Sequence, residues 1–236
     1  MPFLANYLPT FSTTGTVETL LASDGSRISR LILSIFAASS SGRNYTSTTC
    51  KKTIDLPSLP VELTRMLALL NVSMSDSGVA SWDTKYFYNI ARPITAIRKG
   101  DLDTNPKTIG DTNWTPLGAP ATNLNGPNFS PPFPAYTSGH ATFGGALFQT
   151  LRNVFGTDNI SFTFVSDELN GVTPGNDGVP RPLRPRTFRT LSEAEEENGQ
   201  SRIYLGIHWK MDKVEGIKMG RTVANYIHLN RFRKKK

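Results

Sequence analysis

Three short segments of this 236-residue chain carry side chains and backbone groups that can bind a tetrahedral oxyanion. They run from Lys85 to Pro93, from Thr137 to His140, and from Ser201 to Asp212, and they include two of the three histidines of the chain. An anion of this kind needs fixed cations, N–H donors and a group that exchanges protons or bonds the central atom. The three segments contain all of these, so the sequence predicts a site for a phosphate-like ion.

The segment Ser138-Gly139-His140 stands where a helix is expected to begin, with Thr137 or Ser138 as its N-cap. The first backbone N–H groups of a helix are unpaired and the helix dipole favours negative charge there. A glycine lets an anion approach this backbone closely. Taken alone, the segment also fits an ordinary helix cap followed by a surface histidine. The pair Gly144-Gly145 one turn later is costly in a helix and predicts close packing against another helix.

The cations and the second histidine follow helical spacing. Lys85 and Arg92 are seven residues apart, which is two turns along one helix face, although such a pair is usually solvated. His208 and Asp212 are four residues apart, so the carboxylate can accept a ring N–H and fix the histidine tautomer. His208 alone fits a core residue as well as a ligand, and only the three segments together favour a functional site.

The order and spacing of these residues resemble the type 2 phosphatidic acid phosphatase superfamily, whose pattern is K-x6-R-P, then P-S-G-H, then S-R-x3-G-x-H-x3-D. The surroundings are similar to the vanadium-dependent haloperoxidases, especially the fungal chloroperoxidase type. Trp82 before the first segment, the run 131–149 and the run 201–209 carry this closer match, which covers roughly residues 60–230. One departure is Thr137, where the family has a proline, so the turn loses the fixed φ of proline.

The resemblance implies a cofactor, vanadate, and a role for each motif residue. His208 would be the axial ligand of vanadium, oriented by Asp212, and His140 would be the acid–base group for hydrogen peroxide. Lys85 would polarise the bound peroxide, and Trp82 and Phe133 would line the halide pocket. The groups expected to donate hydrogen bonds to the vanadate oxygens are Lys85, Arg92, Ser138, Gly139 and Arg202.

Two enzyme functions share such a site. A haloperoxidase would oxidise chloride or bromide with hydrogen peroxide to a hypohalous species, which then reacts with a small organic acceptor. An acid phosphatase would use His208 as a nucleophile that forms a phosphohistidine and His140 to protonate the leaving oxygen. The haloperoxidase is favoured because Trp82 and Phe133 match that branch, and phosphatase activity in the vanadate-free form stays open. A non-catalytic anion-binding helical protein is the third hypothesis.

The elements that must position these residues are predicted to be helical. Apolar spacing and the chain breakers predict helices over 27–38, 59–73, 79–91, 138–155 and 203–229, with irregular stretches at 38–49, 100–134 and 166–198. Arg202 is expected at the start of the last helix, with Gly206 permitting a change of direction. Periodicity and resemblance together predict an all-α helical bundle with two long irregular loops around the oxyanion site, as one domain over 1–236.

The amino-acid composition excludes several classes of partner and site. The formal charge is +7 and the pI is about 9.6, but the cations converge on spaced motif positions and not along one exposed face, which argues against nucleic acid. Cys50 is the only cysteine, which excludes an intrachain disulfide and a cysteine-based metal cluster. The apolar run 28–38 is too short for a membrane helix and contains Arg30.

The first residues lack the charged and apolar regions of a secretory signal, so we expect a soluble protein and leave its compartment open. The chain is short for a haloperoxidase, and both a fragment and a minimal family member fit that length. The oligomeric state, monomer or homodimer, also stays open.

Overall fold

The computed structural model describes residues 60–117, 130–165, 169–175 and 177–233. Its helices are α2 (Pro60–Tyr88), α3 (Pro93–Arg98), α4 (Gly139–Phe155), α5 (Leu191–Tyr204) and α6 (Lys210–Asn230), with a short 3-10 turn, η1, at Gly100–Leu102. Two three-residue strands, β1 (Phe162–Phe164) and β2 (Arg186–Phe188), pair in an antiparallel ribbon. The predicted all-α class is confirmed, whereas the predicted helix 27–38 and loop 38–49 lie outside the described residues.

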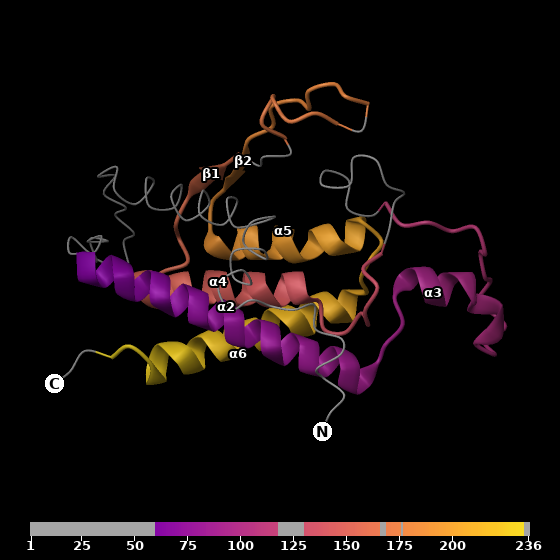
Figure 1. Ribbon diagram of the computed structural model, residues 1–236, viewed down its shortest axis with the longest axis horizontal. Helices are drawn as coiled ribbons and strands as arrows, with labels where there is room; N and C mark the ends of the chain where they lie inside the picture. The colour runs from indigo at the N-terminus through magenta and orange to yellow at the C-terminus, as the bar shows by residue number, and fades with distance from the viewer. Residues whose placement is uncertain (1–59, 118–129, 166–168, 176, 234–236) are drawn as a thin grey trace.

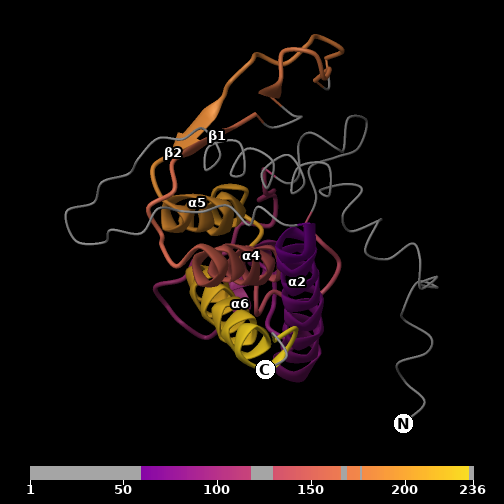
Figure 2. The same cartoon turned by 90° about the vertical axis from the view of Figure 1, so that its left-hand side faces the viewer.

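Helix α4 occupies the middle of the bundle. Helices α2 and α6 cross beneath it and α5 lies on its opposite side (Figure 1), and the view turned by 90° shows α5, α4 and α6 as successive layers with α2 at their flank (Figure 2). The main core cluster fills the space between α2, α4, α5 and the ribbon; its members are Met66, Leu70, Leu147, Phe148, Leu151, Ile160, Phe162, Phe188, Leu191 and Ala194. None of the helices in the described part of the chain combines the length and apolar character needed to cross a membrane.

Helix α2 replaces the two separate helices predicted over 59–73 and 79–91. The joining segment is helical because Ser73, Ser77 and Ser81 are fully buried and Gly78 packs against the Phe143 ring. Small polar residues make a close helix contact here, and apolar periodicity does not detect it.

Helix α2 also ends earlier than predicted, at Tyr88. Asn89 takes a left-handed conformation with φ of 49°, which stops the helix. Arg92 therefore does not share a helix face with Lys85, contrary to the prediction, and stands instead at the N-cap of α3.

The stretch 166–198 was predicted to be irregular, and this is wrong for its second half, which forms β2 and most of α5. The acidic run inside α5 is stabilised by distant cations. Glu195 is buried and receives hydrogen bonds from Arg152 on α4 and Arg221 on α6. A buried carboxylate with two guanidinium partners can be accommodated where an isolated one could not.

The last helix was predicted as one long helix over 203–229 with a change of direction at Gly206, and its start is wrong, because α5 ends at Tyr204 and α6 begins at Lys210. The break contains Gly206, whose φ of 72° lies in the left-handed region. The expected change of direction at this glycine is therefore confirmed, although Arg202 belongs to the last turn of α5 and not to the start of α6.

Helices α4 and α6 approach each other backbone to backbone. A Cβ added at Gly145 would collide with the carbonyl of Ile217, and one at Gly220 would collide with the carbonyl of Thr142. A Cβ at Gly216 would lie 2.9 Å from the Ser138 carbonyl oxygen. The close packing predicted from Gly144-Gly145 is thus observed, and it brings the N-terminal ends of both helices together.

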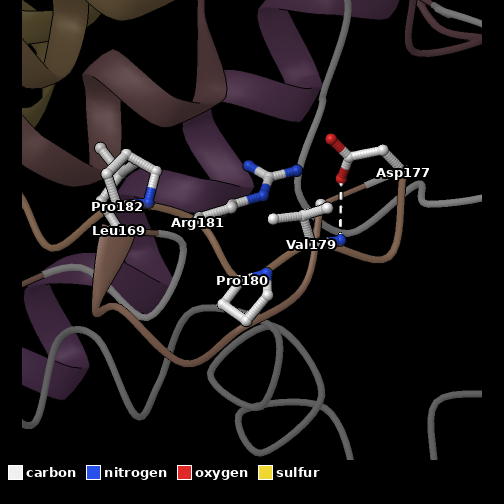
Figure 3. A pocket seen from close by; sticks show the side chains of 7 residues that line it. Leu169, Asp177, Val179, Pro180, Arg181 and Pro182 are labelled. Atoms are coloured by element: carbon white, nitrogen blue, oxygen red, sulfur yellow. Dashed lines mark hydrogen bonds between the residues drawn. The ribbon is translucent and has the colours of Figure 1, made fainter.

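Between the two strands the chain forms a surface arm, visible above α5 in Figure 1. The Gly175 N–H donates to the Val179 carbonyl at 2.8 Å and closes a tight turn. Residues of this arm, including Asp177 and Arg181, line a surface hollow of about 580 Å³ (Figure 3). The hollow contains none of the motif residues, so the chemistry is expected elsewhere.

Candidate active site

The three sequence motifs meet where α2 ends and where α4 and α6 begin. Lys85 Nζ donates to the Thr137 carbonyl, the Ser138 N–H donates to the Asp212 carbonyl at 3.0 Å, and Arg92 Nη1 lies 2.9 Å from His208 Nε2. Segments more than a hundred residues apart in sequence are thereby joined by direct hydrogen bonds.

Lys85 is completely buried in the last turn of α2. Its ammonium donates to the carbonyls of Pro134 and Ala135, both at 3.0 Å, as well as to that of Thr137. The ammonium lies 5.6 Å from the ring centroid of Trp82 and 5.3 Å from that of Phe133. Burial, followed by repulsion from the Arg92 cation, lowers the pKa of Lys85 to about 7, although Asp212 acts in the opposite direction.

Arg92 is the second buried cation, with 5% of its surface exposed. Its Nε donates to the Phe133 carbonyl and its Nη1 to the Ile207 carbonyl, both at 2.8 Å. Burial lowers the pKa of Arg92 to about 10, so it remains a cation at neutral pH. Its Nη2 is buried and has no hydrogen-bond partner among the described residues. An unpaired buried donor costs about 1–3 kcal/mol, and a ligand that accepts from it would recover this energy.

His208 does not lie on α6 as predicted, because it precedes the first residue of that helix by two positions. The predicted pairing is nevertheless present, since His208 Nδ1 lies 2.8 Å from Asp212 Oδ2. The same carboxylate oxygen accepts the Trp209 N–H at 3.0 Å, because Asp212 occupies the N3 position of α6 and caps its start. This arrangement holds the ring and the helix start in one unit.

The tautomer of His208 follows from its two partners. Arg92 Nη1 can only donate, so His208 Nε2 accepts and the ring proton lies on Nδ1, where it is donated to Asp212. Burial lowers the pKa of His208 to about 4, because the hydrogen bond to Asp212 does not compensate for desolvation and for the nearby cations. The imidazole is therefore neutral at neutral pH and directs a lone pair from Nε2 into the site.

Ser138 is the N-cap of α4, as one of the two predicted alternatives stated. Its hydroxyl accepts the Ala141 N–H at 3.3 Å. Gly139 is packed under Trp82, since a Cβ at this position would lie 2.8 Å from the indole ring. His140 follows in the first turn and is partly exposed, and its carbonyl accepts from the Asn198 side chain at 3.1 Å.

The remaining predicted residues form the edges of this cluster. Trp82 and Phe133 contact each other with ring centroids 5.3 Å apart, and the Arg92 guanidinium carbon lies 4.9 Å from the Phe133 centroid. Arg202 reaches the cluster through its backbone, because its carbonyl accepts the Ile207 N–H at 3.2 Å, while its Nε donates to Ser201 Oγ at 3.0 Å. Hydrogen bonds thus connect Lys85, Arg92, Ser138, Asp212 and His208 through side chain or backbone. Arg202 is joined to them by its carbonyl bond to the Ile207 N–H, and His140 follows Gly139 in the first turn of α4.

Sequence reasoning missed the groups that hold Lys85 in place. Three backbone carbonyls between Pro134 and Thr137 accept its hydrogen bonds, and no sequence pattern specifies such acceptors. It also missed Ser81 and Thr84, whose hydroxyls contact that of Thr137. Their spacing of three residues on a helix, upstream of Lys85, was an available signal.

Comparison with known proteins relates this chain to vanadium enzymes. The family described as the VCPO second helical-bundle domain matches residues 65–234. The vanadium chloroperoxidase of Curvularia inaequalis is 40% identical over 191 residues, which are 70% of this chain and 31% of that protein.

Solved structures to which this chain is similar are also vanadium-dependent peroxidases. The first bacterial vanadium-dependent iodoperoxidase superimposes with a TM-score of 0.54 and 30% identity over 73% of this chain and 34% of that one. A holo-type bacterial vanadium-dependent chloroperoxidase gives a TM-score of 0.51 over 68% of this chain and 34% of that one, and its 20% identity supports the fold alone. The chain spans about a third of the length of these relatives.

Proposed function

Because this chain belongs to the VCPO second helical-bundle domain family, we propose that it holds vanadate and serves the oxidation of a halide by hydrogen peroxide to a hypohalous species. The observation that carries the proposal is the neutral His208 ring, whose Nε2 lone pair faces the buried Arg92 guanidinium. The substrates, hydrogen peroxide and halide, and a small organic acceptor are part of the proposal.

The residues of the site fit a vanadate group on three counts. Arg92 Nη2 is a buried donor that lacks an acceptor among the described residues. The pKa values of Lys85 and Arg92 are both lowered by burial, and an anion bound between them would offset this unfavourable desolvation. His208 Nε2 carries no proton, as a ligand to vanadium requires.

In this proposal His208 would hold the vanadate group through Nε2, and Asp212 fixes the His208 tautomer through Nδ1. Arg92 Nη1 and a vanadium ligand bond would use the same Nε2 lone pair, so Arg92 would turn its donors toward the oxygens of the bound group. The other groups that would hold these oxygens are Lys85, Ser138, Gly139 and Arg202. Vanadate supplies a Lewis acid that activates peroxide, and vanadium keeps its oxidation state throughout.

The chain itself would supply proton transfer and exclusion of water. His140, in the first turn of α4 and partly exposed, would take a proton from incoming hydrogen peroxide and return it to the leaving oxygen. Trp82 and Phe133 form an apolar wall beside the Lys85 ammonium, where a halide would be poorly hydrated and therefore more reactive.

The test is peroxide-dependent halogenation of a phenol dye, with and without added vanadate. We expect turnover only with vanadate, and His140→Ala should retain vanadate but lose about 10²- to 10⁴-fold in rate. Halogenation that does not require vanadate, or no halogenation with any halide tested, would contradict the proposal.

A second candidate function is hydrolysis of phosphate monoesters. The same neutral His208 ring, with Nε2 free of a proton and Nδ1 held by Asp212, favours it because this is the state of a histidine nucleophile. Release of a chromogenic alcohol from its phosphate ester by the vanadate-free protein would support this function, and inhibition by added vanadate would locate it in the same site.

A further inference from the structure

Thr137 stands at the one motif position where this chain departs from the family pattern, and its side chain is completely buried. Its hydroxyl donates to Ser81 Oγ at 3.2 Å and lies 3.3 Å from Thr84 Oγ1, and its backbone N–H donates to Thr84 Oγ1 at 3.4 Å. A proline could make none of these bonds, because it has neither a hydroxyl nor an N–H.

These bonds end on the same helix turn that carries Lys85. Ser81 and Thr84 lie four and one residues before Lys85 on α2, and the Ser81 hydroxyl also reaches the Thr137 carbonyl at 3.4 Å. That carbonyl is one of the three acceptors of the Lys85 ammonium. Thr137 is therefore bound to α2 through its side chain, its N–H and its carbonyl.

We propose that Thr137, with Ser81 and Thr84, is a positioning element that holds the Lys85 ammonium in the oxyanion site. We call these three residues the hydroxyl latch. The latch fixes the carbonyl of Thr137 against the cation. Since Ser138 and Gly139 follow directly, it also fixes the start of α4 relative to Lys85.

The inference rests on the proposed function, because it concerns how the same site binds its anion. A structural role alone would make Thr137 important for stability but not for the anion affinity of the folded protein. A positioning role predicts a loss of affinity that depends on Lys85.

The experiment compares Thr137→Val, which removes only the hydroxyl, with Thr137→Ser, which keeps it. Thr150→Val is the matched control: Thr150 is equally buried on α4, but its hydroxyl donates to the Ala146 carbonyl at 2.8 Å, outside the motifs. Vanadate binding to each folded variant is measured by calorimetric titration, beside its thermal midpoint. We expect Thr137→Val to bind about 3- to 10-fold more weakly, and Thr137→Ser and Thr150→Val to bind as the wild type does.

The dependence on Lys85 is tested by combining Thr137→Val with Lys85→Met. If the latch acts through the ammonium, Thr137→Val should have no further effect on affinity in the Lys85→Met background. Equal affinities of Thr137→Val and Thr150→Val, or strictly additive losses in the double variant, would overturn the latch while leaving the proposed function intact. A wild-type protein that binds no vanadate would overturn the proposed function and the latch with it.

Discussion

Replacement of Asp212 by asparagine tests whether this carboxylate sets the state of His208. Asp212 Oδ2 accepts from both His208 Nδ1 and the Trp209 N–H. If the amide oxygen introduced by Asp212→Asn takes the Oδ2 position, it can accept from both groups, but both hydrogen bonds lose the charge of the carboxylate. If the NH₂ takes the Oδ2 position instead, it loses the bond from Trp209 and faces His208 Nδ1, which favours the tautomer with the proton on Nε2; that proton faces the Arg92 donor, and the nitrogen cannot bind vanadium.

The expected magnitude follows from the bond that is lost. A hydrogen bond to a charged group contributes about 1.5–3 kcal/mol, and a factor of ten in affinity corresponds to about 1.4 kcal/mol. Asp212→Asn should therefore weaken vanadate binding about 10- to 100-fold. His208→Ala, which removes the ligand itself, should abolish binding and mark the upper limit of the series.

Glu215→Gln provides the control for charge. It removes one negative charge from the first turns of the same helix, but Glu215 pairs only loosely with Lys218, at 3.6 Å on the surface. Vanadate affinity is measured by calorimetric titration of all three variants and the wild type at one pH. If Asp212→Asn binds no more weakly than Glu215→Gln, Asp212 acts as a distant charge and the tautomer argument is refuted.

Three further predictions concern pH and halide choice. Sulfate keeps its charge across neutral pH, so its affinity for the wild type should fall as the pH rises through about 7, where Lys85 loses its proton. The affinity of Lys85→Met should show no such step, and a wild-type affinity that does not change with pH would contradict this prediction. The pKa of His208 is about 4 in the folded protein against 6.5 ordinarily. As the pH falls, the unfolded chain therefore takes up this proton before the folded protein does, and the stability that His208 contributes above pH 6.5 is lost toward pH 4. Denaturant titrations should show a smaller acid loss for His208→Gln than for the wild type, and equal losses would refute the assignment. Phe133→His should lower chlorination of a phenol dye relative to bromination, because a polar ring replaces the apolar wall beside Lys85; an unchanged ratio in steady-state assays would show that Phe133 does not set halide choice.

The sequence predicted those features of the fold that depend on residues close together in the chain. The start of α4 follows from the capping residue Ser138, and the change of direction before α6 follows from Gly206, since both depend on a few neighbouring residues. The pairing of His208 with Asp212 was also predicted from spacing, although the helix begins after the histidine and the contact is made by an N-terminal cap.

Features that depend on distant residues were not predicted. Helix α5 contains an acidic run that its sequence alone marks as solvated, and it is held by Arg152 and Arg221 from two other helices. The buried serines of α2 carry no apolar signal, because their small size matters only where α4 and α6 pack against them. In the same way, the position of Arg92 beside His208 depends on the fold and not on its spacing from Lys85.

The glycine contacts between α4 and α6 restrict how this site can open. Many binding sites admit ligands by shear, in which packed helices slide past each other. Here the two backbones lie so close that a Cβ at Gly145 or at Gly220 would collide with a carbonyl of the partner helix. Such a close contact resists sliding, so we expect the two helices to move as one rigid body. Ser138 at the start of α4 and Asp212 in the first turn of α6 would then keep a constant separation, since they are joined by a backbone hydrogen bond. We therefore expect ligand exchange to depend on rotation of side chains such as Arg92, which is faster than the collective motion of helices.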